Sequence, residues 1–139
     1  MYQFHGWITV EETCENRDIE DEKIYKIIKE IKNHIAKLNW TDFDGIIDIR
    51  PFNGTFFIWL AGHPNHKPFD EYGPIELFKY IGQVSPGSYG ILYVLDDEDL
   101  QDNNDNYFKV FALARGLVKE YRDHFLSPVM PTVFTFPID

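Results

Sequence analysis

Two apolar runs joined by a tight-turn signal constrain the fold of this chain more than any other feature. Residues 45–50 and 54–61 both have the composition of β-strands, and the intervening turn at 51–54 ends in Asn53-Gly54. An Asn-Gly pair favours the backbone conformation of a two-residue hairpin turn. We therefore expect these two runs to pair as antiparallel strands, and the rest of the chain must be arranged around that sheet.

Strand and helix patterns alternate along the remainder of the chain. Residues 2–11 alternate apolar and polar side chains, which predicts a strand. From about Asp18 as far as Leu38, apolar side chains recur at helical spacing. A second helix is expected from about Pro74 to Val84, because proline suits the first turn of a helix. Further strands are expected over residues 89–95, 107–113 and 117–121.

The predicted order of elements is β-α-β-β-α-β-β-β. Short turns between neighbouring strands imply one mostly antiparallel sheet of about six strands, with the two helices packed on one face. The tail at 127–131 is expected to be extended and irregular. A chain of 139 residues has the size of one domain, so we expect a single α+β domain over 1–139.

Charge and cysteine content exclude several classes of function. Thirteen Lys and Arg oppose 23 Asp and Glu, and the net charge of −10 argues against binding to nucleic acid or to an anionic membrane surface. No apolar run approaches the roughly 18 residues of a membrane-spanning helix. The single cysteine, Cys14, is expected to be an unpaired thiol, and residues 1–7 lack a signal-peptide pattern. These features predict a cytoplasmic protein.

The most acidic segment lies at residues 96–105, which contain six acidic residues and no cation. A solvated hairpin loop is the favoured interpretation, and a docking surface for a basic partner is the second. A calcium loop is a third, but it requires a carboxylate at its twelfth position. A loop starting at Asp96 would have Tyr107 there, and one starting at Asp97 would have Phe108.

Candidate catalytic and metal-binding residues are few. His63 and His66 are spaced as two metal ligands can be, but Pro64 and Pro68 indicate a loop, so a polar turn is favoured over a metal site. The chain contains no G-x-S-x-G motif, no P-loop and no G-x-G-x-x-G motif. We therefore assign no catalytic residue and no cofactor. The alternatives to a binding protein are a small metal-dependent enzyme and a calcium-responsive binding domain.

The predicted strand at 54–61 is apolar on both of its faces. Its even-numbered side chains share one face, and Phe57, Trp59 and Ala61 share the other. A sheet with one face in water normally carries polar side chains on that face. Burial on both sides, partly beneath the C-terminal tail, is therefore the favoured interpretation. In the alternative, Trp59 belongs to an exposed aromatic platform that anchors a protein partner.

Several motifs together carry a family resemblance. They lie at residues 2–7 (YQFHGW), 54–62 (GTFFIWLAG) with Asn65-His66, 75–81 (IELFKYI), 86–93 (PGSYGILY) with the acidic residues 96–99, 114–116 (ARG) and 123–128 (DHFLSP). In this order, over essentially the whole chain, they resemble the immunity protein 7 family of bacterial polymorphic-toxin systems. The resemblance implies an α+β cytoplasmic protein, encoded beside a toxin, that binds the toxin domain and blocks it without being an enzyme.

The acidity of the chain fits the inhibition of a basic toxin. Many such toxins are nucleases, which hold phosphates with basic side chains, and an acidic inhibitor can steer association and compete for the same groove. We therefore expect a cognate toxin domain as the partner. The candidate toxin-binding residues are Asp96, Asp97, Glu98, Asp99, Asp102 and Asp105, a second acidic patch of Glu11, Glu12, Glu15 and Asp18, and Trp59.

Overall fold

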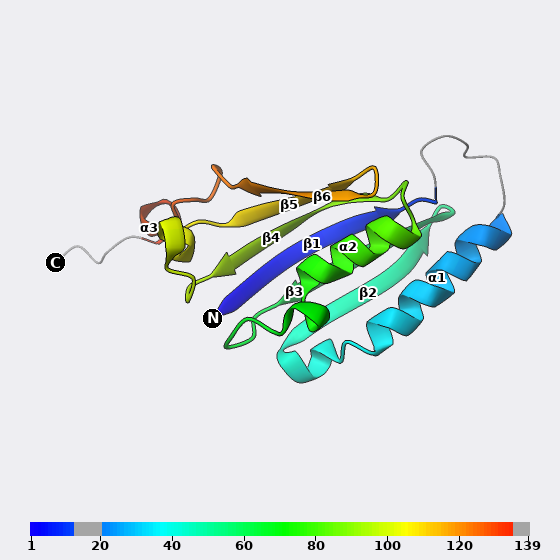
Figure 1. Ribbon diagram of the computed structural model, residues 1–139, viewed down its shortest axis with the longest axis horizontal. Coiled ribbons are helices and arrows are strands. Elements are labelled where there is room, and N and C mark those ends of the chain that lie inside the picture. The colour runs from blue at the N-terminus through cyan, green and yellow to red at the C-terminus, as the bar shows by residue number, and fades with distance from the viewer. Residues whose placement is uncertain (13–20, 135–139) are drawn as a thin grey trace.

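A six-stranded antiparallel sheet forms the centre of the molecule (Figure 1). The computed structural model describes residues 1–12 and 21–134. The strands are β1 (Tyr2–Val10), β2 (Gly45–Phe52), β3 (Thr55–Gly62), β4 (Tyr89–Asp96), β5 (Lys109–Ala114) and β6 (Leu117–Arg122). They pair in the order β2-β3-β1-β4-β5-β6, and each neighbouring pair is antiparallel. The N-terminal strand β1 therefore lies inside the sheet, between β3 and β4.

The two long helices, α1 (Asp21–Ala36) and α2 (Pro74–Val84), lie on the same face of this sheet (Figure 1). The shorter helical elements are η1 (Trp40–Phe43), η2 (Asp70–Tyr72), η3 (Gln101–Asn106) and α3 (Val129–Thr132). The predicted α+β class, element order and one-sided helix layer are confirmed. The predicted first helix began at about Asp18, which lies outside the described residues.

The turn between β2 and β3 has the conformation that its sequence predicts. Asn53 and Gly54 both have positive φ angles, 51° and 80°, and they bring Phe52 opposite Thr55. Two successive residues in the left-handed region match the twist of the flanking strands, which is why an Asn-Gly pair is favoured in such turns. The predicted hairpin is therefore confirmed.

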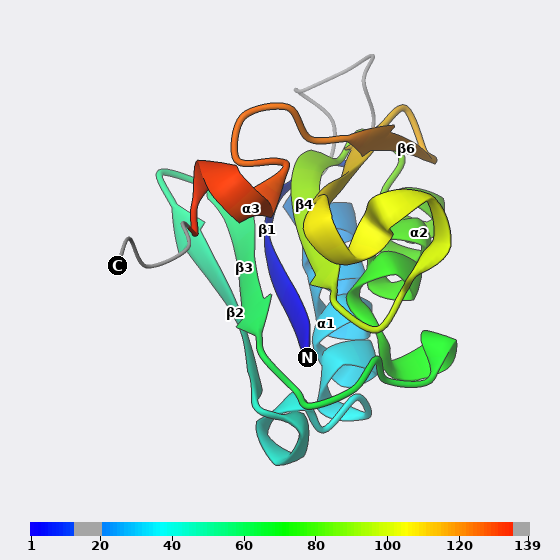
Figure 2. The ribbon, with the colours of Figure 1, turned by 90° about the vertical axis from the view of Figure 1, so that its left-hand side faces the viewer.

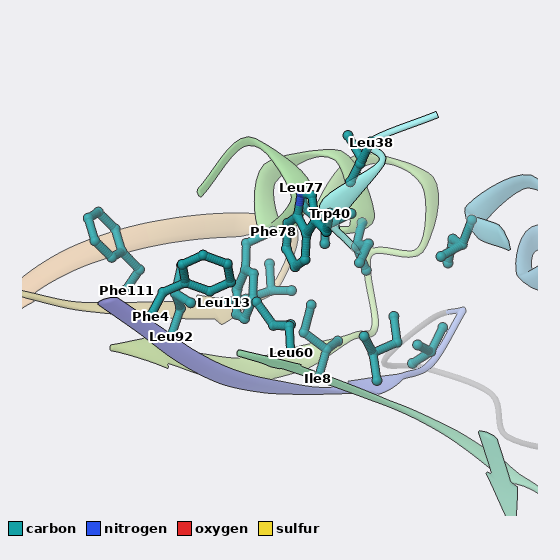
Figure 3. Close-up of a cluster of buried hydrophobic side chains, with 14 of the residues drawn as sticks. Phe4, Ile8, Leu38, Trp40, Leu60, Leu77, Phe78, Leu92, Phe111 and Leu113 are labelled. Atoms are coloured by element: carbon teal, nitrogen blue, oxygen red, sulfur yellow. The ribbon is translucent and has the colours of Figure 1, made fainter. Parts of the chain in front are cut away.

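The main hydrophobic core lies between the sheet and the two helices (Figure 3). Alternate residues of β1 point into it, and Phe4 and Ile8 are 3% and 0% exposed. Figure 3 shows these strand side chains meeting Leu77 and Phe78 of α2. Trp40 closes one end of the core, where its Nε1–H donates a hydrogen bond to the carbonyl oxygen of Tyr72 at 2.7 Å. Each apolar side chain that is fully buried here contributes about 1.5–3 kcal/mol to folding.

A second, smaller core attaches the C-terminal segment to the opposite face of the sheet, on the side away from α1 and α2 (Figure 2). Leu95, Phe108 and Val129 are buried against one another there. The expectation that residues 127–131 are extended and irregular holds for the backbone of Pro128 and Met130. It misses the short turn α3, which is closed by the hydrogen bond from Thr132 N–H to Pro128 O at 3.0 Å. Contact with the sheet provides the burial that this short sequence cannot provide alone.

Candidate functional site

The sheet face opposite the helices carries two exposed tryptophans at its centre. Trp7 of β1 and Trp59 of β3 are directly opposite each other in the strand register and are 41% and 42% exposed. The Trp59 ring lies 6.0 Å from Phe57 in a stacked arrangement and 5.7 Å from Phe52 edge-on. Trp7 meets Tyr89 edge-on at 6.2 Å. The rings therefore hold one another in place while leaving much of their surface exposed.

These aromatic side chains belong to a larger apolar surface that crosses four strands. We define the aromatic face as the large apolar side chains that are exposed or half-buried on the outward side of β2, β3, β1 and β4: Ile46, Phe52, Phe57, Trp59, Trp7, Tyr89, Ile91 and Tyr93. The polar side chains of Gln3, His5, Asp48 and Arg50 lie on the same side of the sheet. A shallow hollow of about 350 Å³ lies at its centre, between Trp7 and Trp59. A second hollow of about 490 Å³ adjoins it beside His5 and Ile46.

The favoured expectation that both faces of β3 are buried, partly beneath the C-terminal tail, is wrong for Trp59. The described part of the C-terminal segment packs on Leu95 and Phe108 instead, and Trp59 remains exposed. The rings of Phe52 and Phe57 cover part of the Trp59 side chain, so its partial burial comes from neighbouring side chains and not from the C-terminal segment. The structure therefore supports the alternative, an exposed aromatic platform that contains Trp59.

The acidic loop, residues 96–105, connects the antiparallel strands β4 and β5, so the predicted hairpin loop is confirmed. Several of its acidic side chains bind groups of the protein itself. The Met1 ammonium group contacts the Asp97 carboxylate at 2.6 Å and Glu98 at 3.7 Å, and the hydrogen bond to Asp97 raises the pKa of this amine. His66 Nδ1 donates to Glu98 Oε1 at 2.5 Å, and this hydrogen bond lowers the pKa of Glu98.

Asp99 organises the next part of the acidic loop. Its carboxylate accepts hydrogen bonds from the backbone N–H of Gln101 at 3.2 Å and from Asn104 Nδ2 at 3.1 Å, and it lies 3.7 Å from Lys109 Nζ. The hydrogen bond from Gln101, together with those partners, holds the pKa of Asp99 below its usual value. Arg122 then donates to Asn104 Oδ1 at 3.0 Å, which ties the loop to β6.

Asp102 and Asp105 are exposed acidic side chains of this loop that bind no other group of the described chain. Both are exposed, and neither side chain has an ion pair or hydrogen bond among the residues that the structure describes. Asp102 has a φ of 49°, a conformation that Asp and Asn tolerate better than most residues. The loop therefore has a fixed part that binds its own cations and an exposed part that carries free charge.

The second predicted acidic patch is only partly described, because Glu15 and Asp18 lie outside the described residues. Glu11 and Glu12 are half-buried at the end of β1, and Glu12 Oε1 lies 2.7 Å from Lys23 Nζ. The backbone oxygen of Glu11 accepts a hydrogen bond from Ser85 Oγ at 2.7 Å. The hydrogen bond from Ser85 connects this segment to the turn before β4, and Lys23 partly neutralises the charge of Glu12.

The structure places the two acidic segments at opposite ends of the sheet. Asp96 pairs with Tyr2 at the start of β1, whereas Glu11 follows Val10 at its end. Nine strand residues span about 30 Å. The candidate acidic residues therefore do not form one patch, and the aromatic face lies between them, with Trp7 in the middle of β1. The contribution of Trp7 was missed because its alternation with buried neighbours is also typical of a structural strand residue.

The histidines that suggested a metal site have other surroundings. His66 contacts Glu98, and the backbone N–H of His63 donates to the carbonyl oxygen of Asp44 at 2.9 Å. Within residues 1–12 and 21–134, no group of three or more His, Cys, Asp or Glu side chains is arranged to hold a metal ion. These histidines form part of the connection between β3 and α2.

A buried carboxylate orders the segment that follows β6. Asp123 is 2% exposed and accepts hydrogen bonds, each 2.9 Å long, from the backbone N–H groups of Phe125 and Leu126 and from Ser127 Oγ. Ser127 Oγ in turn accepts a hydrogen bond from the backbone N–H of Phe108 at 2.9 Å. This turn presents Phe125, 85% exposed, to solvent.

The described residues thus present an exposed aromatic sheet face with an acidic segment at each end. Comparison with known families shows that the chain belongs to the immunity protein 7 family, which it matches over residues 1–135. Members of this family are non-enzymatic toxin inhibitors of polymorphic-toxin systems. No curated protein matches the chain. Among the described helices, none is both long and apolar enough to cross a membrane.

We expect Asp123→Ala to lower the free energy of unfolding by about 1–3 kcal/mol, because two backbone N–H groups and the Ser127 hydroxyl lose their acceptor. Urea denaturation at pH 7 measures the change. Asp105→Ala is the matched control, since Asp105 is exposed and has no side-chain partner in the described part of the chain. An equal, small effect of both substitutions would contradict this role for Asp123.

The same pair of variants tests the pH dependence. Burial opposes ionisation of Asp123, but the hydrogen bonds from Phe125, Leu126 and Ser127 outweigh it and hold the pKa of the carboxyl below its ordinary value. A lowered pKa in the folded state stabilises the protein above the unfolded-state pKa of about 3.9. That contribution is lost as the pH falls toward the folded-state value. The stability difference between the native protein and Asp123→Ala should therefore shrink below about pH 4.

Proposed function

We propose that this immunity protein neutralises a basic toxin domain, such as a nuclease, in the cytoplasm by occluding it with the aromatic face. The observation that carries the proposal is the pair of exposed tryptophans, Trp7 and Trp59, opposite each other on an open sheet face. The family implies binding to a cognate toxin. A binding partner would give this apolar surface the burial that the described chain leaves incomplete.

The aromatic face has the features of an interface centre. Tryptophan and tyrosine are enriched among the residues that dominate binding energy, and such residues act best in hollows from which water is excluded. Trp7 and Trp59 flank a hollow that also contacts Ile91 and Tyr93. Because the neighbouring rings already restrict both indoles, binding requires little additional ordering of these side chains.

The acidic residues support a basic partner through a different effect. Exposed charges such as Asp102 and Asp105 add little affinity each, but they attract a cationic partner over a distance and raise the rate of association. A nuclease carries the required positive charge because it must hold phosphate groups. Glu11 and Glu12, at the other end of the sheet, are proposed as a weaker contribution of the same kind.

The first test is co-expression with each toxin gene found beside the gene for this chain. We expect the toxin to stop growth when it is expressed alone and growth to recover when this protein is also produced. A matched control expresses the toxin with the Trp7→Ala/Trp59→Ala variant. If no neighbouring toxin is neutralised by the native protein, the proposed function is wrong.

The second test examines the aromatic face directly. We expect Trp7→Ala and Trp59→Ala each to weaken toxin binding by at least about 2 kcal/mol, because truncation removes a central apolar anchor. Isothermal titration calorimetry measures the affinity for the toxin, and urea denaturation verifies that the variants fold. Tyr25→Ala is the control, since Tyr25 is 62% exposed on α1, on the helix side of the sheet. Equal affinities of the three variants would exclude the aromatic face from the interface.

The third test separates charge from apolar contact. We expect Asp102→Asn/Asp105→Asn to slow association with the toxin and to flatten its dependence on salt, with a smaller effect on dissociation. Stopped-flow measurements at several salt concentrations give both rates. The control Glu30→Gln/Asp42→Asn removes the same charge from exposed positions on α1 and η1. If both double variants associate equally fast at low salt, the acidic loop has no specific steering role.

A further inference from the structure

A pocket of about 300 Å³ opens on the helix side of the sheet, beside the first two turns of α2. It exists because α2 is too short to cover the strands below it. The 11 residues of α2 extend about 16 Å, whereas the eight residues of β4 extend about 26 Å. The uncovered part is lined by Val94 of β4, Phe111 of β5 and Tyr2 of β1.

Tyr2 presents an unpartnered hydroxyl group to this pocket. The residue is 2% exposed, and its hydroxyl makes no hydrogen bond to any residue that the structure describes. Burial, and then the nearby charges of Asp96 and Asp70, raise the pKa of Tyr2, so the hydroxyl keeps its proton. Among the described residues no buried side-chain polar atom lacks a hydrogen-bond partner, so the Tyr2 hydroxyl is open to the pocket and is not sealed in the core. It is therefore available to a polar group of a ligand that enters the pocket.

The charged side chains around the pocket favour a cationic guest. Three lysines and five acidic residues line it, giving a net charge of −2: Lys67, Lys79, Lys109, Asp70, Glu76, Asp96, Asp99 and Glu120. Each lysine already lies within 3.2–3.7 Å of an acidic partner. Asp96 forms no ion pair with a described residue, although its charge acts on the nearby Met1 ammonium group. Its Oδ1 accepts a hydrogen bond from the backbone N–H of Glu98 at 3.1 Å.

We propose that this pocket receives an arginine side chain of the toxin, with its guanidinium group between the Tyr2 hydroxyl and the Asp96 carboxylate. The inference rests on the proposed function, because it identifies a second contact for the same partner. Val94 and Phe111 provide apolar surface for the arginine stem, and a guanidinium group suits planar recognition of a carboxylate. Asp99 belongs to the acidic loop and also lines the pocket, so the pocket adjoins the loop on which the partner is proposed to dock.

Two conservative substitutions test the pocket. Tyr2→Phe removes only the hydroxyl, and Asp96→Asn removes the charge while keeping an oxygen that can accept from Glu98 N–H. We expect each to weaken toxin binding about 10-fold or more, the effect of losing a hydrogen bond to a charged group. The double variant should weaken toxin binding by less than the product of the two single fold-changes, because both side chains contact the same arginine. Tyr25→Phe and Asp42→Asn, at exposed positions on α1 and η1, are the matched controls.

Isothermal titration calorimetry measures the affinity of the full chain and its variants for the neighbouring toxin domain. Urea denaturation verifies that each variant folds. Tyr2→Phe removes a hydroxyl that has no partner in the described chain, so this variant should fold normally. If Asp96→Asn is destabilised, the toxin affinity of Tyr2→Phe alone decides the outcome. Replacement of each toxin arginine by alanine should identify one whose effect disappears in the Tyr2→Phe background. If the native chain binds tightly but both variants bind like their controls, or no toxin arginine is coupled to Tyr2, the inference is wrong while the proposed function stands. If the native chain binds no neighbouring toxin, the proposed function itself fails.

Discussion

The exposed surface of this protein follows from the placement of both long helices on one side of a wide sheet. Six strands spaced about 4.8 Å apart form a sheet roughly 24 Å wide, and two helices of about 10 Å each cover one face of it. In the described chain, the other face has only the short α3 and its attached segment, which pack on Leu95 and Phe108. The remaining outward side chains must therefore be stable in water or be covered by another molecule. The aromatic face is among them, beside polar side chains such as Asp48 and Arg50, and its apolar surface favours the second alternative.

The central position of β1 determines which residues meet on that face. Because β1 lies between β3 and β4, its register places Trp7 opposite Trp59 on one side and opposite Ile91 on the other. Close packing of β4 fixes this arrangement, since a Cβ atom on Gly90 would collide with the backbone carbonyl of Trp7 and lie 2.9 Å from Ile8 Cα. The same position of β1 brings the Met1 ammonium group to Asp97 and so connects the strand to the acidic loop.

Local features were predictable from the sequence, whereas contacts between distant segments were not. Asn53-Gly54 and Pro74 specify their own backbone conformations, so the hairpin and the start of α2 follow from a few adjacent residues. Strand order depends on packing across the whole chain, so the pairing of Trp7 with Trp59 could not be deduced from either motif. Similarly, the partners of Glu98 are 32 and 97 positions away, at His66 and Met1, and nothing in the acidic loop itself indicates them.

These internal partners change how the net charge of −10 should be interpreted. Asp97 and Glu98 face the Met1 ammonium group at 2.6 and 3.7 Å, and Asp99 faces Lys109 at 3.7 Å, so a partner would have to compete with existing contacts to use these carboxylates. Their number therefore overstates the binding energy that the loop can offer. At a distance, however, a partner responds to the summed charge, which is screened over about 8–10 Å at physiological salt. Acidity can thus accelerate an encounter, while lasting affinity has to come from surfaces that lose water, chiefly those around Trp7 and Trp59.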